Sequence, residues 1–439
     1  KNSCEIWTGL SGILAMRFGT SEKLVLKIDV AMNDFLRSGT IRGGTMFLFG
    51  GFLANAFYYL YRLAMGRLLS PSEFGEVAVF LSLMLIVSSP VLPLQMIVVK
   101  SVSRACARGM AGAFKQLLLK VSVFGCIVAA FLLAFAAVLG APVREFWILV
   151  FATLLIALLG VSSGMLQGLE RFSRLALVVF TDGFVRFGLG VLFVFLGFRV
   201  AGALAGILVS LAVAYILALV SLGDVIREKN KERFLFDTYF LSHAFWMFLG
   251  FLALHTLWNA DVLLVQRYFT AYETGIFSAF ATLGKAVSLF GILLAGVLFP
   301  VVVRRTEEGR ETYRPLWAGI GLTVGLSFAA TVVLWIFPRF FVGALLGEQY
   351  LEGARYLGYY GGMMGLVGLI FLLSYFFMAR GRFSFVYVLL GAVILELLLI
   401  ARFHESFQQV LLVLFLAAAG ALAGLLFLLR RMLRSGQSI

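Results

Sequence analysis

Charged residues are scarce in this sequence. Asp, Glu, Lys and Arg together make up 13% of the 439 residues, whereas hydrophobic residues make up 62%. A soluble domain has about a quarter of its residues charged and roughly half apolar, so this composition excludes an ordinary soluble globular protein. The mean hydropathy of +1.02 agrees. The sequence therefore predicts an integral membrane protein.

Cysteines are also few, and one common nucleotide-binding motif is missing. The three cysteines are Cys4, Cys106 and Cys126, and an odd number without metal-type spacing gives neither a disulfide framework nor a zinc site. The sequence has no Gly-x-x-x-x-Gly-Lys-Ser/Thr motif, which would bind the phosphates of ATP. We therefore expect no metal, no cofactor and no direct coupling to ATP.

Long apolar runs dominate the sequence instead. A helix needs about 20 apolar residues to cross the ~30 Å hydrocarbon core of a bilayer. Twelve candidate spans lie at 45–66, 76–99, 118–139, 146–166, 175–197, 200–222, 240–265, 275–299, 316–337, 355–378, 383–401 and 407–429. The expected fold class is all-α integral membrane, with twelve transmembrane helices.

The longest polar joint, GDVIREKNKERFLFD, follows the sixth span and divides the spans into two sets of six. Two sets of six enter the membrane with the same orientation, which is typical of a parallel repeat about an axis along the membrane normal. We expect an N-lobe at 45–222, a cytoplasmic linker at 223–239 and a C-lobe at 240–429.

The two ends of the chain are expected to be cytoplasmic. Residues 1–44 form an N-terminal extension without the pattern of a signal peptide, and residues 430–439 form a tail. Residues 1–31 are either part of the protein or sequence upstream of a start at Met32.

Lys and Arg gather in the joints after even-numbered spans, such as the one that begins with Lys100, Arg104 and Arg108. Because cytoplasmic loops carry the excess of positive charge, this pattern predicts a protein of the cytoplasmic membrane with both termini inside. The net charge of +14 then reflects topology and attraction to anionic membrane lipid, and nucleic acid is not expected as a partner.

One stretch of the first half is repeated in the second. The two copies are RLLSPSEFGEVAVF at 67–80 and RYFTAYETGIFSAF at 267–280. In each copy a hydroxyl residue, Ser70 or Thr270, precedes a glutamate, Glu73 or Glu273, by three positions. This is the capping-box pattern that begins a helix. A spacing of 200 residues is too long for a solenoid and predicts two similar halves.

A set of short motifs resembles the polysaccharide-unit flippases. The motifs are the first repeat copy, SGMLQGLERF at 163–172, NADVLLVQRYFTAYETGIFSA at 259–279 and LLAGVLFPVVVRR at 293–305. These flippases are similar to multidrug extruders and lipid II flippases, with which they form one superfamily. The resemblance covers residues 38–432 in order. It implies a V-shaped pair of six-helix lobes that moves a polyprenyl-linked oligosaccharide from the inner to the outer leaflet.

Ionisable residues inside spans are costly and usually face a cavity or a partner. Six such residues are Arg62, Asp182, Arg186, Asp261, Lys285 and Glu396. Asp182 and Arg186 are four apart and can pair on one helix face. The pair either neutralises itself to ease insertion, or Asp182 positions Arg186 to hold a diphosphate, which suits a guanidinium fork.

Lys285 lies near the middle of its span, without an acid three or four residues away. It is the strongest candidate for binding an anionic substrate, because snorkelling to the interface is hard from that depth. Arg62 is a further substrate-binding candidate near the outer end of the first span, where snorkelling is the alternative.

Oxygen ligands for Na⁺, or a carboxylate for H⁺, are available on the seventh span in Asn259 and Asp261. The alternative for Asp261 is a structural salt bridge to Lys285. Glu396 is a third candidate for ion coupling. Pro90 and Pro93 interrupt the second span and are candidate hinges, although a static kink explains them equally well.

The function expected from these features and from the resemblance is secondary transport by alternating access, without enzymatic activity. The expected partners are a polyprenyl-linked oligosaccharide, membrane lipid, Na⁺ or H⁺, and glycan-assembly proteins. A multidrug extruder on the same scaffold is the alternative, although Arg186 and Lys285 disfavour a cationic cargo. A membrane polysaccharide polymerase or ligase is a third reading, but the joints expected outside are short and carry no clustered acids.

Overall fold

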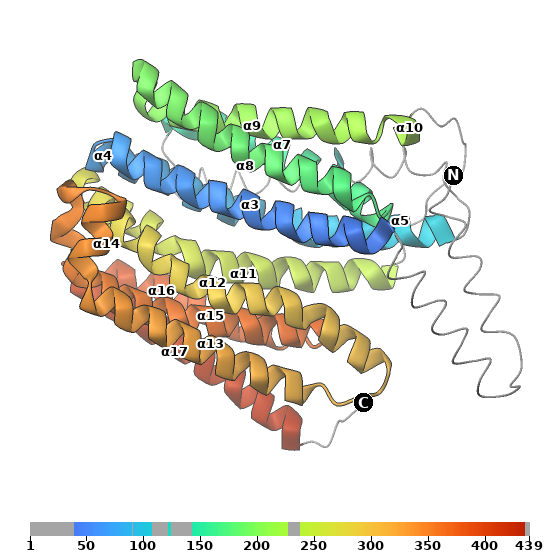
Figure 1. Ribbon diagram of the computed structural model, residues 1–439. Helices are drawn as coiled ribbons and strands as arrows, with labels where there is room; N and C mark the ends of the chain where they lie inside the picture. Colours follow the sequence, from blue (N-terminus) through green and yellow to red (C-terminus); the bar gives the residue numbers. More distant parts are fainter. Residues whose placement is uncertain (1–38, 90, 108–121, 124–142, 227–237, 435–439) are drawn as a thin grey trace, which may run out of the picture. The chain divides into compact units, whose positions relative to one another are not determined.

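The computed structural model describes residues 39–89, 91–107, 122–123, 143–226 and 238–434, and every regular element in these ranges is helical (Figure 1). The first half contains α3 (Gly39–Leu68), α4 (Pro71–Ser88), α5 (Val91–Ala107), α7 (Val143–Gly168), α8 (Phe172–Phe193), the π-helical turn η2 (Val194–Phe198), α9 (Arg199–Ser221) and α10 (Gly223–Ile226). The second half contains α11 (Thr238–Tyr268), α12 (Ala271–Glu307), α13 (Tyr313–Ile336), α14 (Pro338–Leu345), the 3-10 segment η3 (Glu348–Tyr356), α15 (Leu357–Ala379), α16 (Phe385–Arg402) and α17 (Phe407–Arg434).

These helices coincide with eleven of the twelve expected spans; the third span, 118–139, lies outside the described residues except at 122–123. Within the described part of the chain, nine helices are long and apolar enough to cross a membrane, with α8 and α9 counted as one. The prediction of a multi-pass helical membrane protein therefore agrees with the structure.

The span expected over 76–99 consists of two helices, α4 and α5, which agrees with the expectation that prolines interrupt it. Helix α4 ends at Ser88. The N–H and the hydroxyl of the next residue, Ser89, both donate to Ile86 O, over 3.2 and 2.7 Å. A proline has no N–H to continue a helix, and Pro93 lies in the first turn of α5, where none is needed. Pro90, the other candidate hinge, lies outside the described residues.

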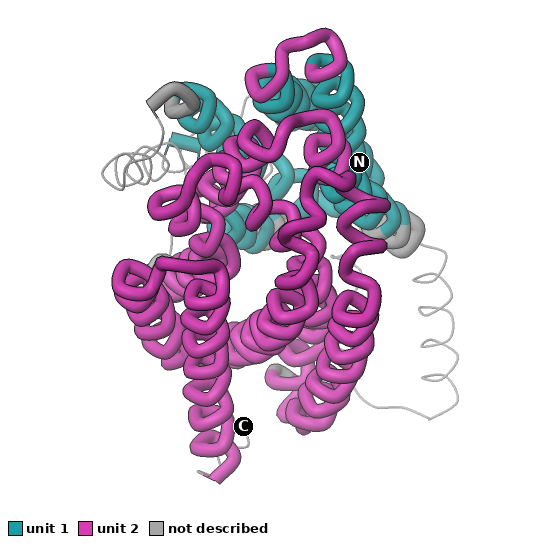
Figure 2. The backbone as a smooth tube through the Cα atoms, turned by 90° about the vertical axis from the view of Figure 1, so that its left-hand side faces the viewer, with its two compact units in different colours: residues 1–61, 91–193, 202–237 teal, residues 62–90, 194–201, 238–439 magenta. Residues whose placement is uncertain are grey.

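The chain forms two compact units (Figure 2). Unit 1 consists of residues 1–61, 91–193 and 202–237, and unit 2 of residues 62–90, 194–201 and 238–439. Residues 62–90 of the first half thus pack with the second half. The lobe boundaries expected at 45–222 and 240–429 stay a prediction.

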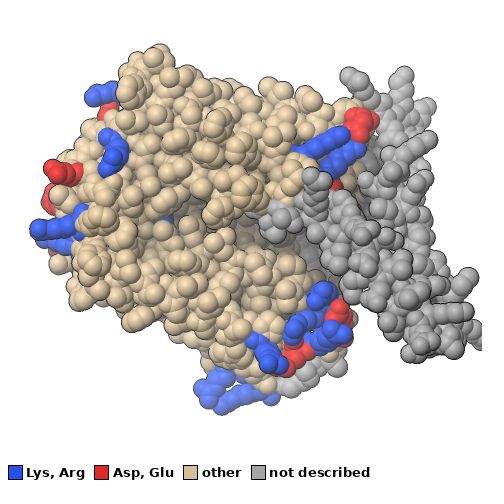
Figure 3. Space-filling model, viewed as in Figure 1, with Lys and Arg blue, Asp and Glu red and all other residues tan. Residues whose placement is uncertain are grey.

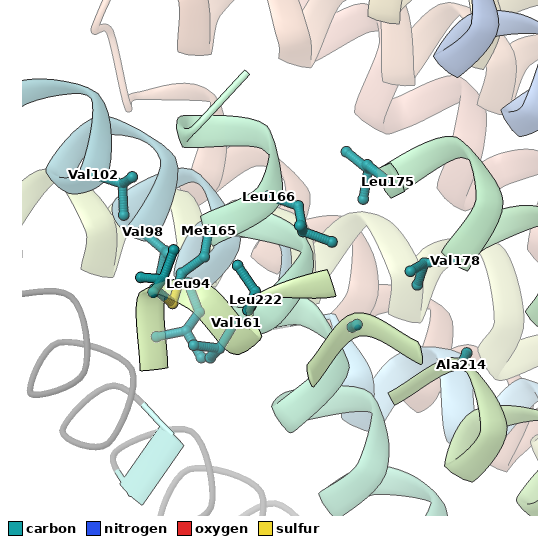
Figure 4. Packing of buried hydrophobic residues seen from close by; sticks show 12 residues of the cluster. Leu94, Val98, Val102, Val161, Met165, Leu166, Leu175, Val178, Ala214 and Leu222 are labelled. Atoms are coloured by element: carbon teal, nitrogen blue, oxygen red, sulfur yellow. The ribbon is translucent and has the colours of Figure 1, made fainter. Parts of the chain in front are cut away.

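Small residues bring the helices of unit 1 together. On α7, a Cβ at Gly164 would lie 3.0 Å from Val98 Cβ, and one at Gly168 would lie 2.7 Å from Val102 Cβ, both on α5. The buried side chains around this contact include Leu94, Val98, Val161, Met165 and Leu166 (Figure 4). Close backbone approach of this kind is typical of helix packing in membranes. There the hydrophobic effect does not drive helices together, and small residues allow the close van der Waals contact that does.

In unit 2, α12 packs on α15 in the same way. A Cβ at Gly368 would lie 3.2 Å from Ser288 O and 3.5 Å from Gly291 N. Charged residues on the face in Figure 3 gather at helix ends, while the helix flanks are uncharged. Such flanks suit contact with lipid.

The repeat found in the sequence is a structural repeat as well. Both copies begin a helix: the N–H groups of Ser70 and Thr270 donate to the carboxylates of Glu73 and Glu273, over 3.0 and 2.9 Å. The capping-box prediction is therefore confirmed.

The two copies also contact each other within unit 2. A Cβ at Gly75 would meet Gly275 N at 3.0 Å and Ala271 O at 3.2 Å, and a Cβ at Gly275 would collide with Pro71 O. Position 75 thus faces 271 and 275, while position 275 faces 71. This reciprocal pattern is characteristic of a local two-fold relation between equivalent segments.

Candidate functional site

A buried cluster of polar residues lies inside unit 2. Lys285 is 5% exposed, and its ammonium donates to Asp261 Oδ1 over 3.1 Å and to Asn259 Oδ1 over 3.5 Å. The Tyr360 hydroxyl donates to Asp261 Oδ2. Asp261 therefore has a partner on each carboxylate oxygen, and the salt bridge to Lys285 that the sequence left as an alternative is present.

Three helices hold this cluster in place. Asn259 and Asp261 lie on α11, Lys285 on α12 and Tyr360 on α15. The Tyr360 ring packs against Phe277 and Phe280 of α12, with ring centroids 5.9 and 5.7 Å apart. A buried charge needs such a partner because burial removes the water that would otherwise solvate it.

Glu396 is the exception among the buried charges. It lies on α16, is 1% exposed, and neither carboxylate oxygen has a hydrogen-bond partner among the described residues. Helix α16 packs against α11, the helix that carries Asp261.

A small pocket adjoins the Lys285 side chain. It is lined by two cations, Arg62 and Lys285, and by the hydroxyl residues Ser82, Ser278 and Thr282, with apolar neighbours from α4, α11 and α12. Its free volume is about 10 Å³, roughly the space of one water molecule. Arg62, expected near the outer end of its span, thus lines the same pocket as Lys285.

A second polar cluster is contained in unit 1. The Asp182 carboxylate accepts hydrogen bonds from Tyr58 Oη at 2.7 Å, Ser210 Oγ at 2.7 Å and Arg186 Nη2 at 3.0 Å. The Arg186 guanidinium also lies over the Tyr58 ring, 4.6 Å from its centroid. The expected Asp182–Arg186 pair is present, and three further contacts surround it.

Tyr61 completes the packing of this cluster. Its hydroxyl donates to Ala203 O over 2.9 Å, and its ring lies where Gly190 leaves room. Arg186 Nε has no hydrogen-bond partner among the described residues, so one donor of the guanidinium is still available.

The sequence-based reading missed Tyr58, Ser210 and Tyr360. The hydroxyl of each donates a hydrogen bond to a buried aspartate. None of the three is charged at neutral pH, so a search for charged residues inside spans does not find them. A tyrosine in the interior of a span, as in GYYGG at 358–362, is the signal that was available. Buried tyrosine hydroxyls usually find a polar partner.

The candidates thus separate into two groups. Arg62, Asn259, Asp261, Lys285 and Glu396 all lie in unit 2, where Glu396 makes no hydrogen bond to the others among the described residues. Asp182 and Arg186 belong to unit 1. Pro93 contacts neither cluster through any hydrogen bond that the structure describes, and its role as a hinge stays a prediction.

Comparison with known proteins gives a family match. The model of a family described as polysaccharide biosynthesis protein matches residues 40–305. This region includes both repeat copies and every residue of the two clusters except Tyr360 and Glu396. No curated protein matches the chain.

Several solved structures have a similar fold. An inward-facing multidrug resistance transporter of the MATE family, in the MOP superfamily, is 16% identical with a TM-score of 0.65, over 86% of this chain and 96% of that one. An outward-facing transporter of the same family is 16% identical with a TM-score of 0.63, over 91% and 97%.

A third similar structure is a MOP superfamily transporter from Pyrococcus furiosus, described as having a binding pocket of reverse polarity that suggests a different function. It is 15% identical with a TM-score of 0.63, over 91% of this chain and 97% of that one. At these identities the likeness concerns the fold. It confirms the predicted fold class, a twelve-helix membrane fold of two lobes. The family match over residues 40–305 confirms the predicted resemblance to polysaccharide exporters.

Proposed function

Because the chain belongs to the family of polysaccharide biosynthesis proteins, we propose that it moves a polyprenyl-linked oligosaccharide from the inner to the outer leaflet of the cytoplasmic membrane. The family and the MOP transporter fold support a membrane transporter. The family match over residues 40–305 is the observation that carries the finer proposal, because it connects that fold to polysaccharide assembly.

The buried cations suit such a substrate. A lipid-linked oligosaccharide has a diphosphate and a sugar head that cannot cross hydrocarbon unaided, while its tail can stay in the lipid. Lys285 and Arg62 line one pocket in unit 2, and Arg186 keeps a free Nε donor in unit 1. Each of these three residues is a candidate for binding the diphosphate, with Asp182 as the residue that positions Arg186.

The driving force is proposed to be an ion gradient, because the sequence has no motif for ATP. Asp261, Asn259 and Glu396 are the candidates for carrying H⁺ or Na⁺. The lobes would alternate access, with both termini in the cytoplasm and with glycan-assembly proteins as partners.

A multidrug extruder is the second candidate, since the similar solved structures include multidrug resistance transporters. An organic cation would have to bind beside Lys285 and Arg62, against two positive charges. Asp261, the acid beside Lys285, already accepts hydrogen bonds from Lys285 and Tyr360, which leaves it poorly placed to pair with a cationic cargo.

The proposal can be tested in proteoliposomes that contain a polyprenyl-linked oligosaccharide with a fluorescent sugar. We expect the protein to make the sugar accessible to a membrane-impermeant quencher on the opposite side. Lys285→Ala is expected to slow this at least tenfold, and Lys285→Arg to keep part of the rate because the charge remains.

A matched assay with a fluorescent organic cation distinguishes the two candidates. Uptake of the cation without movement of the oligosaccharide would contradict the flippase proposal. Normal flipping by a well-folded Lys285→Ala protein would remove Lys285 from the substrate site.

A further inference from the structure

The pocket beside Lys285 lies between the two copies of the repeat, inside unit 2. Most of the residues that line it form pairs of equivalent positions, 200 residues apart, such as Ala78 with Ser278 and Ser82 with Thr282. A space lined by the same positions of two related segments lies on the local two-fold axis between them. The pocket is therefore on the same interface of α4 with α12 as the glycine contact at positions 75 and 275, about one to two helical turns further along.

One side chain of the pocket has a hydroxyl that needs a partner. Ser278 is 1% exposed, and its Oγ has no hydrogen-bond partner among the described residues. Ser278, Thr282 and Lys285 follow one another at i, i+4 and i+7 on α12, so all three lie on the helix face that lines the pocket. A buried hydroxyl without a partner is costly, so a group in the pocket that bonds to Ser278 would stabilise the fold.

The Lys285 ammonium also has a donor to spare. An ammonium carries three N–H groups and accepts no hydrogen bond. Two of them are used by Asp261 Oδ1 and Asn259 Oδ1, over 3.1 and 3.5 Å. The third has no acceptor among the described residues, and Lys285 lines the pocket. An oxygen atom in the pocket would complete the hydrogen bonds of this buried charge.

The size and charge of the pocket select the occupant. Its volume of about 10 Å³ is that of one water molecule and excludes a sugar, a phosphate or any other polyatomic ligand. A metal ion would lie beside two cationic side chains, Arg62 and Lys285. A water molecule fits, because buried waters occupy polar sites of this size where they make about two to four hydrogen bonds.

We propose that the pocket binds one water molecule, which joins the two copies of the repeat. The water accepts hydrogen bonds from the Lys285 ammonium and the Ser278 hydroxyl. Its own hydrogens are directed to the hydroxyl oxygens of Ser82 on α4 and Thr282 on α12, which also line the pocket. The site belongs to the packing of α4 on α12 and holds whatever the protein transports.

Electron cryo-microscopy of the full-length protein in nanodiscs, bound to a rigid antibody fragment, tests the site directly. We expect one peak of ordered density in the pocket, within about 2.7–3.2 Å of both Lys285 Nζ and Ser278 Oγ. A map that shows other buried waters but no peak at this position would overturn the proposal.

The sign of one stability change gives a second test. Ser278→Ala removes a partner of the water, so the melting temperature should fall, on the order of 2 °C for a chain of this length. A hydroxyl that bonded to nothing would behave in the opposite way. Its removal would leave the melting temperature unchanged or raise it, because alanine is the better helix former and a costly buried group is lost.

Ser374→Ala is the matched control for this comparison. Ser374 is 0% exposed, its hydroxyl also has no partner among the described residues, and it does not line the pocket. The melting temperature of Ser374→Ala should therefore stay the same or rise. A Ser278→Ala protein that behaves like Ser374→Ala would show that no water binds to Ser278.

The local symmetry offers a rescue experiment. Ala78→Ser places a hydroxyl on the opposite wall of the pocket, at the position equivalent to 278. Added to Ser278→Ala, it should restore most of the lost melting temperature, because the water regains a partner. A double variant less stable than Ser278→Ala would contradict a water shared by the two copies. Transport enters none of these measurements, so their outcome is independent of the proposed function.

Discussion

Lys285 and Asp261 depend on each other inside unit 2. Their 3.1 Å ion pair is almost fully buried, with side chains 7% and 1% exposed. Breaking a buried pair by removing one partner costs about 3–5 kcal/mol, because the other charge is then left alone. Removing both partners avoids that penalty.

We therefore expect Lys285→Ala and Asp261→Ala each to lower thermal stability, and the double variant to recover much of the loss. The measurement is a double-mutant cycle by thermal unfolding in detergent. Additive losses in the double variant would show that the two charges do not stabilise each other. Asp261→Asn should be milder than Asp261→Ala, because it keeps an oxygen for the Tyr360 hydroxyl.

An exposed ion pair offers the contrasting case. Arg171 Nη1 donates to Asp224 Oδ1 over 2.7 Å, and this hydrogen bond lowers the pKa of Asp224 from 3.8 to about 2. Because the folded pKa is lowered, the stabilisation is present above about pH 4 and is lost as the pH falls towards 2. The Asp224 side chain is 58% exposed, so solvent screening limits the contribution to about 1 kcal/mol or less.

Thermal unfolding of the wild type and Asp224→Asn between pH 2 and 7 checks this expectation. The wild type should be slightly more stable at neutral pH, and the difference should shrink below about pH 4. A difference that grows as the pH falls contradicts the assigned sign.

At the scale of helices, the sequence predicted where elements begin better than how they meet. The capping boxes at Ser70 and Thr270 are local patterns, so they could be read directly. The contact between Gly75 and Gly275 joins positions 200 residues apart and has no local signal. The interruption near Ser89 could be expected from Pro90 and Pro93, which follow it directly in the sequence.

The glycine contact predicts a graded effect of added methyl groups. A Cβ at Gly275 would overlap Pro71 O, whereas a Cβ at Gly75 would meet Gly275 N at 3.0 Å. We expect Gly275→Ala to destabilise by about 1–3 kcal/mol or more, as overpacking does, and Gly75→Ala by less. Gly296→Ala, on the same helix α12 with nothing within 4 Å, is the control and should be neutral or stabilising. Equal melting temperatures for Gly275→Ala and Gly296→Ala would contradict the contact.

Helix α14 and η3 form hydrogen bonds with the end of α3 inside unit 2. Gln349 Nε2 donates to Gly66 O and Leu69 O over 3.2 and 3.1 Å, and Arg67 Nη2 donates to Ala344 O at the end of α14. Each of these two helix ends therefore receives a side-chain donor from the other segment. Helix α14, with 8 residues, was not among the expected spans because it is too short to cross a bilayer.

Gln349→Glu replaces the donor with a carboxylate of the same shape, which faces two carbonyl oxygens. We expect it to destabilise more than Gln349→Ala, which loses about 0.5–1.5 kcal/mol per hydrogen bond. Gln408→Ala, at an exposed glutamine, is the control. Thermal unfolding measures which variant loses more stability. A Gln349→Glu protein as stable as the wild type would show that the hydrogen bonds from Gln349 to the end of α3 do not stabilise the fold.

At the scale of the whole molecule, composition alone indicated a membrane protein, and the pattern of apolar runs indicated its helices. The polar clusters were only partly predictable. Their charge inside apolar spans identified Asp182, Arg186, Asp261 and Lys285 as candidates. The four-residue spacing of Asp182 and Arg186 also predicted their ion pair. Pairing across helices depends on which faces meet, and that information is distributed over the packing of α11, α12 and α15.

Orientation in the membrane is the property that the basic joints predict for the entire chain. Glu405 lies in the joint between α16 and α17, and Arg310 in the joint between α12 and α13. Because joints after odd-numbered spans are expected outside, a single cysteine at 405 should react with a membrane-impermeant maleimide in intact cells, and one at 310 should not. The background is a chain in which Cys4, Cys106 and Cys126 are replaced by serine. Permeabilising the cells should make position 310 reactive, which shows that its thiol is intact. Labelling at 310 but not at 405 in intact cells would reverse the orientation, and the proposed direction of flipping would reverse with it.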